Sequence, residues 1–230
     1  MKRHGFSLRQ FAGRFPSVQE RCYVMGKLAT DPLYPAVHGV LRSTTAPLLD
    51  VGCGMGVLAF YLRQRGWRSP ITGVDYDARK IATAHRLAGD FGADLEFLEG
   101  DAATSLPAHR GSVTVLDILQ YFAPTTRDAM LRQCAARIAH DGVLVIRTGI
   151  MDETWRFRVT RLIDRMANRL NWMKDPPLHY PARNELCQLL KGAGLSGDFK
   201  PLWGRTPFNN WLGVFRRQTP MTPDKPPKDH

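Results

Sequence analysis

The fold of this 230-residue chain is decided by one stretch, Leu48-Leu49-Asp50-Val51-Gly52-Cys53-Gly54-Met55-Gly56-Val57-Leu58. An apolar strand leads into it, glycine occupies every second position from 52 to 56, and a helical pattern runs from Val57 to about Arg65. Alternate glycines permit a sharp turn and, we expect, leave backbone N–H groups bare at a helix N-terminus. The stretch therefore predicts a nucleotide-type binding loop.

The glycine spacing narrows the class of ligand. A dinucleotide fingerprint reads G-x-G-x-x-G and places its glycines against a pyrophosphate. Here the spacing is G-x-G-x-G, and an aspartate stands two residues before the first glycine. A carboxylate aimed into the loop repels pyrophosphate but suits an ammonium group, which S-adenosylmethionine (SAM) carries. The stretch resembles motif I, hh(D/E)hGxGxG, of class I SAM-dependent methyltransferases, and the resemblance assigns cofactor binding to Asp50, Gly52, Cys53, Gly54 and Gly56.

Acidic residues also close the next two expected strands. The strand Ile71-Thr72-Gly73-Val74 ends at Asp75, and a third strand over 95–98 leads to Asp101. In a doubly wound sheet the second strand ends beside the glycine loop, where a carboxylate can accept hydrogen bonds from both ribose hydroxyls. By the resemblance, Asp75 holds the ribose with Tyr76 beside it, and Asp101 and Ala102 meet the adenine.

The fourth expected strand, over 113–119, contains one residue that does not fit a buried strand. A parallel strand covered on both faces should be apolar throughout, so Asp117 stands out. It occupies the motif IV position, where cofactor and acceptor meet. We therefore assign Asp117 to both cofactor binding and catalysis, and Tyr121 to catalysis.

The remaining patterns complete an α/β fold, a doubly wound Rossmann-like sheet of seven strands with an antiparallel last strand. Further strands are expected over 143–147, 197–203 and 211–217, and helices over 18–29, 34–41, 78–88, 125–139 and 183–192. The length fits one domain over 1–217, with an N-terminal helical cap over 1–45 and a helical insertion over 152–181. The tail, 218–230, is rich in proline and charge and is expected to be disordered.

Composition excludes several classes of protein. Hydrophobic content of 43% and charged content of 23% are ordinary for a globular protein, and no apolar run reaches the roughly 18 residues of a membrane span. The basic N-terminus leads into no continuous apolar segment, so we expect a cytoplasmic protein without a secretory signal. The cysteines form no C-x-x-C pair and have no histidine at zinc spacing, which predicts reduced thiols and no metal.

The net charge of +11 and the pI near 9.9 are unusual. Such a balance attracts polyanions, meaning RNA, anionic lipid or an acidic protein, although a merely solvated basic surface explains it equally well. One basic flank of the expected insertion helix consists of Arg158, Arg161, Arg165 and Arg169. For this flank we predict docking of an acidic carrier protein that presents a tethered substrate.

Topology predicts which residues face the cofactor. A helix that leads directly into a parallel strand begins near the carboxyl-terminal edge of the sheet, so the segment with His179 and Tyr180 lies there. His179 is the candidate general base for a phenol, whose pKa near 10 calls for a base that works near neutral pH. A loop histidine that binds a backbone carbonyl is the structural alternative. The aromatic residues expected on this face, which suits a flat aromatic substrate, are Tyr121, Trp155, His179, Tyr180, Trp203 and Phe208.

A closer resemblance is to the small methyltransferases of bacterial aryl polyene pigment clusters. It is carried by the segments 31–37, 116–122, 154–158, 178–181 and 201–210. It implies methylation of a small aromatic or polyene-type metabolite, with phenolic O-methylation of a carrier-bound substrate as one form. Gln120 stands where that group has histidine, which puts a catalytic role at this position in doubt.

Two other functions stay open from the sequence. An RNA or ribosomal methyltransferase agrees with the charge, although no RNA-binding module is appended and motif IV lacks an N/D-P-P-Y/F signature. A non-catalytic SAM-binding regulatory subunit agrees with an intact cofactor loop that has no obvious nucleophile box. The sequence does not distinguish oxygen, nitrogen or carbon as the methyl acceptor, or a free substrate from a tethered one.

Overall fold

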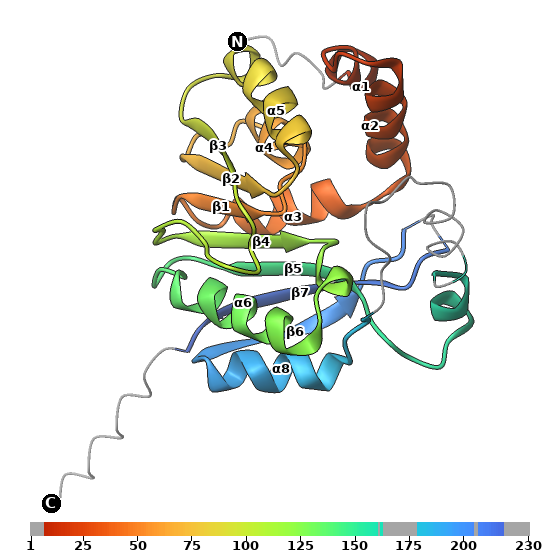
Figure 1. Ribbon diagram of the computed structural model, residues 1–230, viewed down its shortest axis with the longest axis vertical. Helices are drawn as coiled ribbons and strands as arrows, with labels where there is room; N and C mark the ends of the chain where they lie inside the picture. Colours follow the sequence, from red (N-terminus) through yellow and green to blue (C-terminus); the bar gives the residue numbers. More distant parts are fainter. Residues whose placement is uncertain (1–6, 161, 163–178, 205–206, 219–230) are drawn as a thin grey trace, which may run out of the picture.

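The computed structural model describes residues 7–160, 162, 179–204 and 207–218, and its centre is a seven-stranded sheet (Figure 1). The strand order is β3-β2-β1-β4-β5-β7-β6, and every neighbouring pair is parallel except the two that include β7. The strands are β1 (Leu48–Val51), β2 (Ile71–Asp75), β3 (Leu95–Glu99), β4 (Ser112–Leu116), β5 (Leu144–Gly149), β6 (Leu195–Pro201) and β7 (Asn210–Arg217). The predicted doubly wound sheet with an antiparallel last strand is confirmed.

Helices cover both faces of this sheet (Figure 1). They are α1 (Leu8–Ala12), α2 (Val18–Thr30), α3 (Leu33–Leu41), α4 (Val57–Gln64), α5 (Ala78–Phe91), α6 (Pro124–Ala136) and α8 (Arg183–Gly192), with a 3₁₀ helix η1 (Leu119–Tyr121) and a helical segment over 155–160. Alternate residues of β5 point to opposite faces. Val145 packs into the cluster formed with α2 to α5, and Ile146 into the cluster formed with α6 and α8.

The cap helix α2 and the 155–160 segment lie at the side of the sheet toward which β4 and β5 point (Figure 1). This side is the carboxyl-terminal edge of the parallel strands. Ligands of open α/β sheets bind in the crevice outside this edge. The cap and the insertion therefore stand where a cofactor and an acceptor would be covered.

The fourth strand is shorter than predicted. It ends at Leu116 because Asp117 adopts a left-handed backbone conformation, with φ 61°, and η1 follows. Aspartate tolerates this conformation better than most residues, and the Asp117 N–H still donates to the carbonyl of Arg147 at 2.8 Å. The predicted end of this strand, at residue 119, was thus wrong. The chain turns at Asp117, the residue that stood out in the sequence.

Other differences from the prediction are small. Strand β6 begins at Leu195 and ends at Pro201, so Trp203 follows the strand instead of ending it. Helix α6 ends at Ala136, three residues early, because Ile138 pairs with Gly111 in an isolated bridge. The insertion helix is seen over 155–160 and at 162. The rest of it, and the tail from 219, lie outside the described residues.

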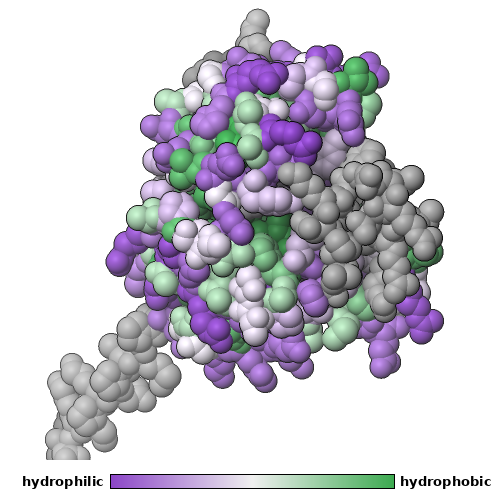
Figure 2. All heavy atoms as spheres, viewed as in Figure 1, coloured by the Kyte–Doolittle hydropathy of each residue, from purple (hydrophilic) through white to green (hydrophobic). Residues whose placement is uncertain are grey.

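The molecular surface seen in Figure 2 is mainly hydrophilic, with apolar residues in small groups. Within the described ranges, no helix is long and apolar enough to cross a membrane.

Gly56 joins the loop after β1 to the core of the domain. Its φ is +76°, and a Cβ atom placed there would lie 2.8 Å from the Phe97 ring. A side chain at this position would therefore strain the backbone and push an aromatic ring that is 1% exposed. The close approach of loop and ring fixes where α4 begins, one residue later.

We predict that Gly56→Ala lowers the free energy of unfolding by about 2–4 kcal/mol, because backbone strain adds to overpacking. The matched control is Gly89→Ala in α5, where no atom lies within 4 Å of the added Cβ. That change should raise stability by about 0.5–1 kcal/mol, as expected for an exposed helical glycine. Urea unfolding of both variants checks this, and equal stabilities would contradict the role given to Gly56.

Candidate active site

The glycine loop opens toward solvent at its central glycine. Gly52, Gly54 and Gly56 have φ values of 77°, 54° and 76°. A Cβ atom on Gly52 would lie 2.6 Å from Ile118, whereas one on Gly54 would meet only Lys80 Cδ, at 3.9 Å. The space that the loop leaves for a ligand is therefore in front of Gly54.

The prediction that the loop leaves its N–H groups bare was wrong at four positions, one of which is Gly56, whose N–H donates to the carbonyl of Cys53 at 3.0 Å. Gly52 and Cys53 donate to the carbonyl of Val74 at 2.8 and 3.0 Å, and Gly54 donates to Asp75 Oδ2 at 2.8 Å. The reason is that β2 ends alongside the loop and supplies these acceptors. The glycines thus provide positive φ values and close approach, while β2 holds the loop in place.

Asp75 lies beside the loop, as the sequence predicted. Its Oδ2 accepts from Gly54 and its Oδ1 accepts from the N–H of Asp77 at 2.9 Å. A carboxylate oxygen can accept more than one hydrogen bond, so both oxygens keep acceptor capacity. Asp75 can therefore bind a diol while it also holds the loop.

Asp50 is buried at the end of β1, and one of its two carboxylate oxygens is bound by the protein. It is 2% exposed, and its Oδ1 accepts from the Thr114 hydroxyl at 2.7 Å. Burial, reinforced by the nearby Asp75 carboxylate and opposed by this hydrogen bond, raises the pKa of Asp50 to about 7. Contact of the Asp50 carboxylate with the ammonium group of a ligand stays a prediction.

The Cys53 side chain points away from the ligand space. A Cβ atom on Gly73 would lie 2.8 Å from Cys53 Sγ, so the thiol packs against β2 inside the core. Burial raises the pKa of this thiol far above its usual value. Cys53 can therefore serve a cofactor only through its backbone. All four cysteines are free, and the described part of the chain holds no group of three metal-ligating side chains.

The residues assigned to the adenine follow β2 and β3 at the same edge of the sheet. Asp75 pairs in register with Glu99, so the two strand ends lie side by side. Tyr76 is 51% exposed, and Asp101 is exposed, with its Oδ1 accepting from Ala103 N–H at 2.8 Å. Ala102 is buried. Their contacts with a cofactor stay a prediction.

Asp117 belongs to a partly buried group of four charges that the sequence did not reveal. Its Oδ2 lies 2.8 Å from Lys27 Nζ and 2.7 Å from Arg147 Nη1. The same Nη1 lies 2.8 Å from Asp31 Oδ2, and Lys27 lies 3.9 Å from Asp31. We call Lys27, Asp31, Asp117 and Arg147 the charge cluster. It joins α2 and its C-cap to the ends of β4 and β5.

The charge cluster keeps Asp117 ionised. Burial acts to raise the pKa of Asp117, but Arg147 and Lys27 outweigh it and hold the pKa below its usual range. Burial also acts to lower the pKa of Lys27, and the Asp117 carboxylate outweighs that effect and raises it. A carboxylate with a lowered pKa is a weak base. Asp117 is therefore suited to an electrostatic role more than to proton transfer, and its catalytic role stays a prediction.

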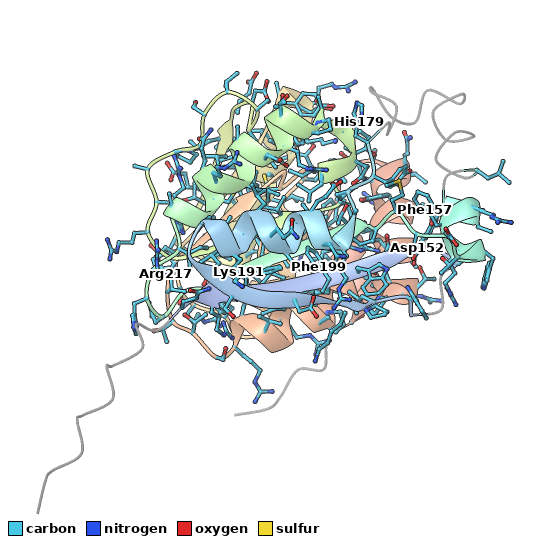
Figure 3. The ribbon with its side chains drawn as sticks, turned by 90° about the horizontal axis from the view of Figure 1, so that it is seen from below. Asp152, Phe157, His179, Lys191, Phe199 and Arg217 are labelled. Atoms are coloured by element: carbon cyan, nitrogen blue, oxygen red, sulfur yellow. The ribbon has the colours of Figure 1, made fainter. Side chains whose placement is uncertain are left out.

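His179 lies beside η1, where the topology predicted it. Its backbone N–H donates to the backbone carbonyl of Gln120 at 3.1 Å, and Gln120 Nε2 donates to the backbone carbonyl of Asp117 at 2.9 Å. In Figure 3, His179, Asp152 and Phe157 lie at one end of the sheet and Arg217 at the other. The structure thus brings His179, Tyr121 on η1 and Asp117 to one edge; their catalytic roles stay predictions.

Aromatic rings gather at this edge in two groups. Tyr180 packs against β5, since a Cβ atom on Gly149 would lie 3.2 Å from its ring, and it meets Phe157 edge-on at 5.2 Å. Arg156 lies 4.8 Å from the ring centres of both Trp155 and Trp203. Phe208 is partly buried. Trp155 is 60% exposed, so it does not line an enclosed site in this structure.

The predicted arginine flank falls largely outside the described residues. Arg158 is exposed. The other three members, Arg161, Arg165 and Arg169, are not described. The docking of an acidic carrier protein therefore stays a prediction.

Residues 48–142 match the model of a family described as a methyltransferase domain. The tRNA1(Val) (adenine(37)-N6)-methyltransferase of Dickeya chrysanthemi is 29% identical over 163 residues, which cover 67% of this chain and 62% of that protein. A ubiquinone biosynthesis O-methyltransferase of Sodalis glossinidius is 28% identical over 151 residues, covering 57% of this chain and 59% of that protein. The matches thus span less than two thirds of these relatives.

Solved structures show the same fold at low identity. Magnesium protoporphyrin IX methyltransferase from Synechocystis PCC 6803, with bound SAH, has a TM-score of 0.65 at 16% identity, covering 88% of this chain and 89% of its own. The mitomycin 7-O-methyltransferase has a TM-score of 0.63 at 19% identity, covering 94% of this chain and 62% of its own. With the glycine loop and the strand order, these results show that the chain has the Rossmann-like fold of class I SAM-dependent methyltransferases and that residues 48–142 form a methyltransferase-type domain.

Proposed function

We propose that this protein transfers the methyl group of SAM to a hydroxyl oxygen of a small aromatic metabolite. One observation carries the proposal: a loop that opens at Gly54 beside Asp75 shares an edge of the sheet with Asp117 and His179. Two of the similar proteins are by name O-methyltransferases of small molecules. The aryl polyene resemblance of the sequence adds the proposal that the acceptor is an aryl polyene precursor.

The residues at the loop fit the cofactor. The space in front of Gly54 admits a ligand against the backbone, and Asp75 retains acceptor capacity for two ribose hydroxyls. Tyr76, Asp101 and Ala102 would border the adenine. SAM supplies a methyl group on a positively charged sulfur.

The chain itself would supply alignment, a fixed charge and a base. Holding a nucleophile in line with the methyl group in a dry site provides much of the rate of such a reaction. Asp117, kept ionised by Lys27 and Arg147, favours positive charge nearby. His179 would remove the proton of a phenol, and Tyr180 would flank its ring. The cap helices α2 and α3 would exclude water from the site at the carboxyl-terminal edge of the sheet.

A second candidate is RNA methylation. The tRNA-modifying relative and the net charge of +11 favour it. Incubation with labelled SAM and either total tRNA or hydroxylated aromatic acids distinguishes the two functions. Transfer of the label to tRNA alone would overturn our proposal and support RNA methylation. SAM binding without any transfer to either class would support the regulatory-subunit alternative.

We predict that Gly54→Val weakens binding of S-adenosylhomocysteine at least about tenfold, because the side chain fills the open space in front of the loop. Isothermal titration calorimetry measures the affinity. Gly89→Ala, far from the loop, serves as the control and should bind as wild type does. Unchanged affinity in Gly54→Val would remove the loop from the cofactor site.

We predict that His179→Asn lowers kcat for a phenolic acceptor by about 10²–10⁴-fold near neutral pH and leaves cofactor binding intact. The rate of the variant should recover as pH rises toward about 10, since the phenol then ionises without help. The exposed His140 provides the control variant, His140→Asn. A parallel pH profile for wild type and His179→Asn would exclude His179 as the base.

We predict that affinity for S-adenosylhomocysteine rises severalfold between pH 6 and pH 8. The raised pKa of Asp50, about 7, means that the carboxyl group gains its negative charge in this interval and then attracts the ammonium group of the ligand. Asp50→Asn should bind more weakly at pH 8 and show a flatter profile. Calorimetry at both pH values provides the test. If affinity changes equally with pH in wild type and in Asp50→Asn, a group other than Asp50 causes the change.

A further inference from the structure

Arg147 is a buried arginine with acceptors on only one side of its guanidinium group. It is 3% exposed, and its Nη1 atom contacts both Asp31 and Asp117. Its Nε atom is buried and has no hydrogen-bond partner, and no residue in the described part of the chain accepts from Nη2. The Nε–H and Nη2–H bonds of an arginine are parallel and match the two oxygens of a carboxylate.

Charge balance also favours an anion at this point. The charge cluster has two cations, Lys27 and Arg147, and two carboxylates, Asp31 and Asp117, so its sum is zero. The cluster therefore has no excess negative charge that would repel a carboxylate. A buried guanidinium side without acceptors is stabilised when a paired anion binds it.

The sheet order places Arg147 on the acceptor side of the site. The glycine loop follows β1 and Asp75 ends β2, whereas Arg147 lies on β5, two strands from β1 in the order β1-β4-β5. Strands lie about 4.8 Å apart, so this separation is about 10 Å. Arg147 alternates with Ile146 and so shares the face of Val145, on which the cap helices pack.

We propose that the Nε/Nη2 side of Arg147 binds a carboxylate group of the methyl acceptor, which makes the substrate class the hydroxylated aromatic carboxylic acids. The inference rests on the proposed function, which leaves the acceptor class open. The methionine carboxylate of the cofactor is a second group that could accept hydrogen bonds from Arg147 Nε–H and Nη2–H. The separation between β1 and β5 favours the acceptor, and the experiment below distinguishes the two sources.

The first test observes the Arg147 Nε–H directly by ¹⁵N NMR. The resonance is assigned by its loss in Arg147→Lys, and Arg137, whose Nε already donates to the carbonyl of Pro107 at 2.8 Å, is the internal control. Benzoate added to the protein loaded with S-adenosylhomocysteine should move the Arg147 signal downfield and leave Arg137 in place. Benzamide should move neither. No shift with benzoate, or an equal shift with benzamide, overturns the proposal.

The source of the carboxylate is decided in the same experiment. If S-adenosylhomocysteine alone moves the Arg147 signal, while 5′-methylthioadenosine, which lacks the amino acid part, does not, the cofactor occupies the site and the acceptor proposal fails. If the signal moves only with benzoate, the carboxylate belongs to the acceptor.

A second test needs no folded Arg147 variant. Wild-type protein loaded with S-adenosylhomocysteine should bind 3,4-dihydroxybenzoic acid roughly tenfold or more tightly than 3,4-dihydroxybenzamide. Equal affinities, or no measurable binding of either compound, overturn the proposal. If Arg147→Lys folds, it should lose this preference, whereas Arg127→Lys, at a buried arginine bound to Asp128, should keep it. Failure of wild type to bind S-adenosylhomocysteine would instead refute the proposed function.

Discussion

The site depends on hydrogen bonds between the end of β2 and the glycine loop. The carbonyl of Val74 accepts from two consecutive loop residues, and the Asp75 carboxylate accepts from the third. A turn with three positive φ values would otherwise have many conformations, and fixing them has an entropic cost of about 1–2 kcal/mol per residue. Because β2 holds the loop before any ligand arrives, the space in front of Gly54 is formed in advance.

The charge cluster holds the other half of the site in a similar way. Exposed ion pairs contribute about 0–1 kcal/mol, and a buried pair is retained only where each charge has well-placed partners. Here two acids share one nitrogen of Arg147, and Lys27 reaches from α2 to the same oxygen of Asp117. The cluster thus links the cap to the sheet, and it also keeps Asp117 anionic in its left-handed conformation. The same ion pairs therefore fix the position of the cap helix and keep Asp117 ionised.

The net charge of the chain and the ion pairs of the charge cluster act over different distances. The sum of +11 acts over a Debye length of about 10 Å, where it favours the approach of anions. The charge cluster has no net charge, so the binding that we propose at Arg147 would depend on hydrogen-bond geometry at short range. An anionic aromatic acceptor agrees with both properties, whereas RNA agrees with the first alone.

The sequence by itself determined the elements whose cause is local. Alternate glycines after Asp50, apolar runs of strand length and acids such as Asp75 at strand ends depend on neighbours in the chain. The resemblance that these residues carry implied the doubly wound sheet with its antiparallel last strand. The tertiary structure decided what depends on distant residues. Lys27 and Asp117 are 90 positions apart, and Asp31 and Arg147 are 116 apart. No periodicity records such pairs, and the same holds for the bonds from β2 that use the loop N–H groups and for the inward turn of Cys53. Whether a polar group faces a ligand or the protein is set by which partner the folded chain brings within hydrogen-bonding distance.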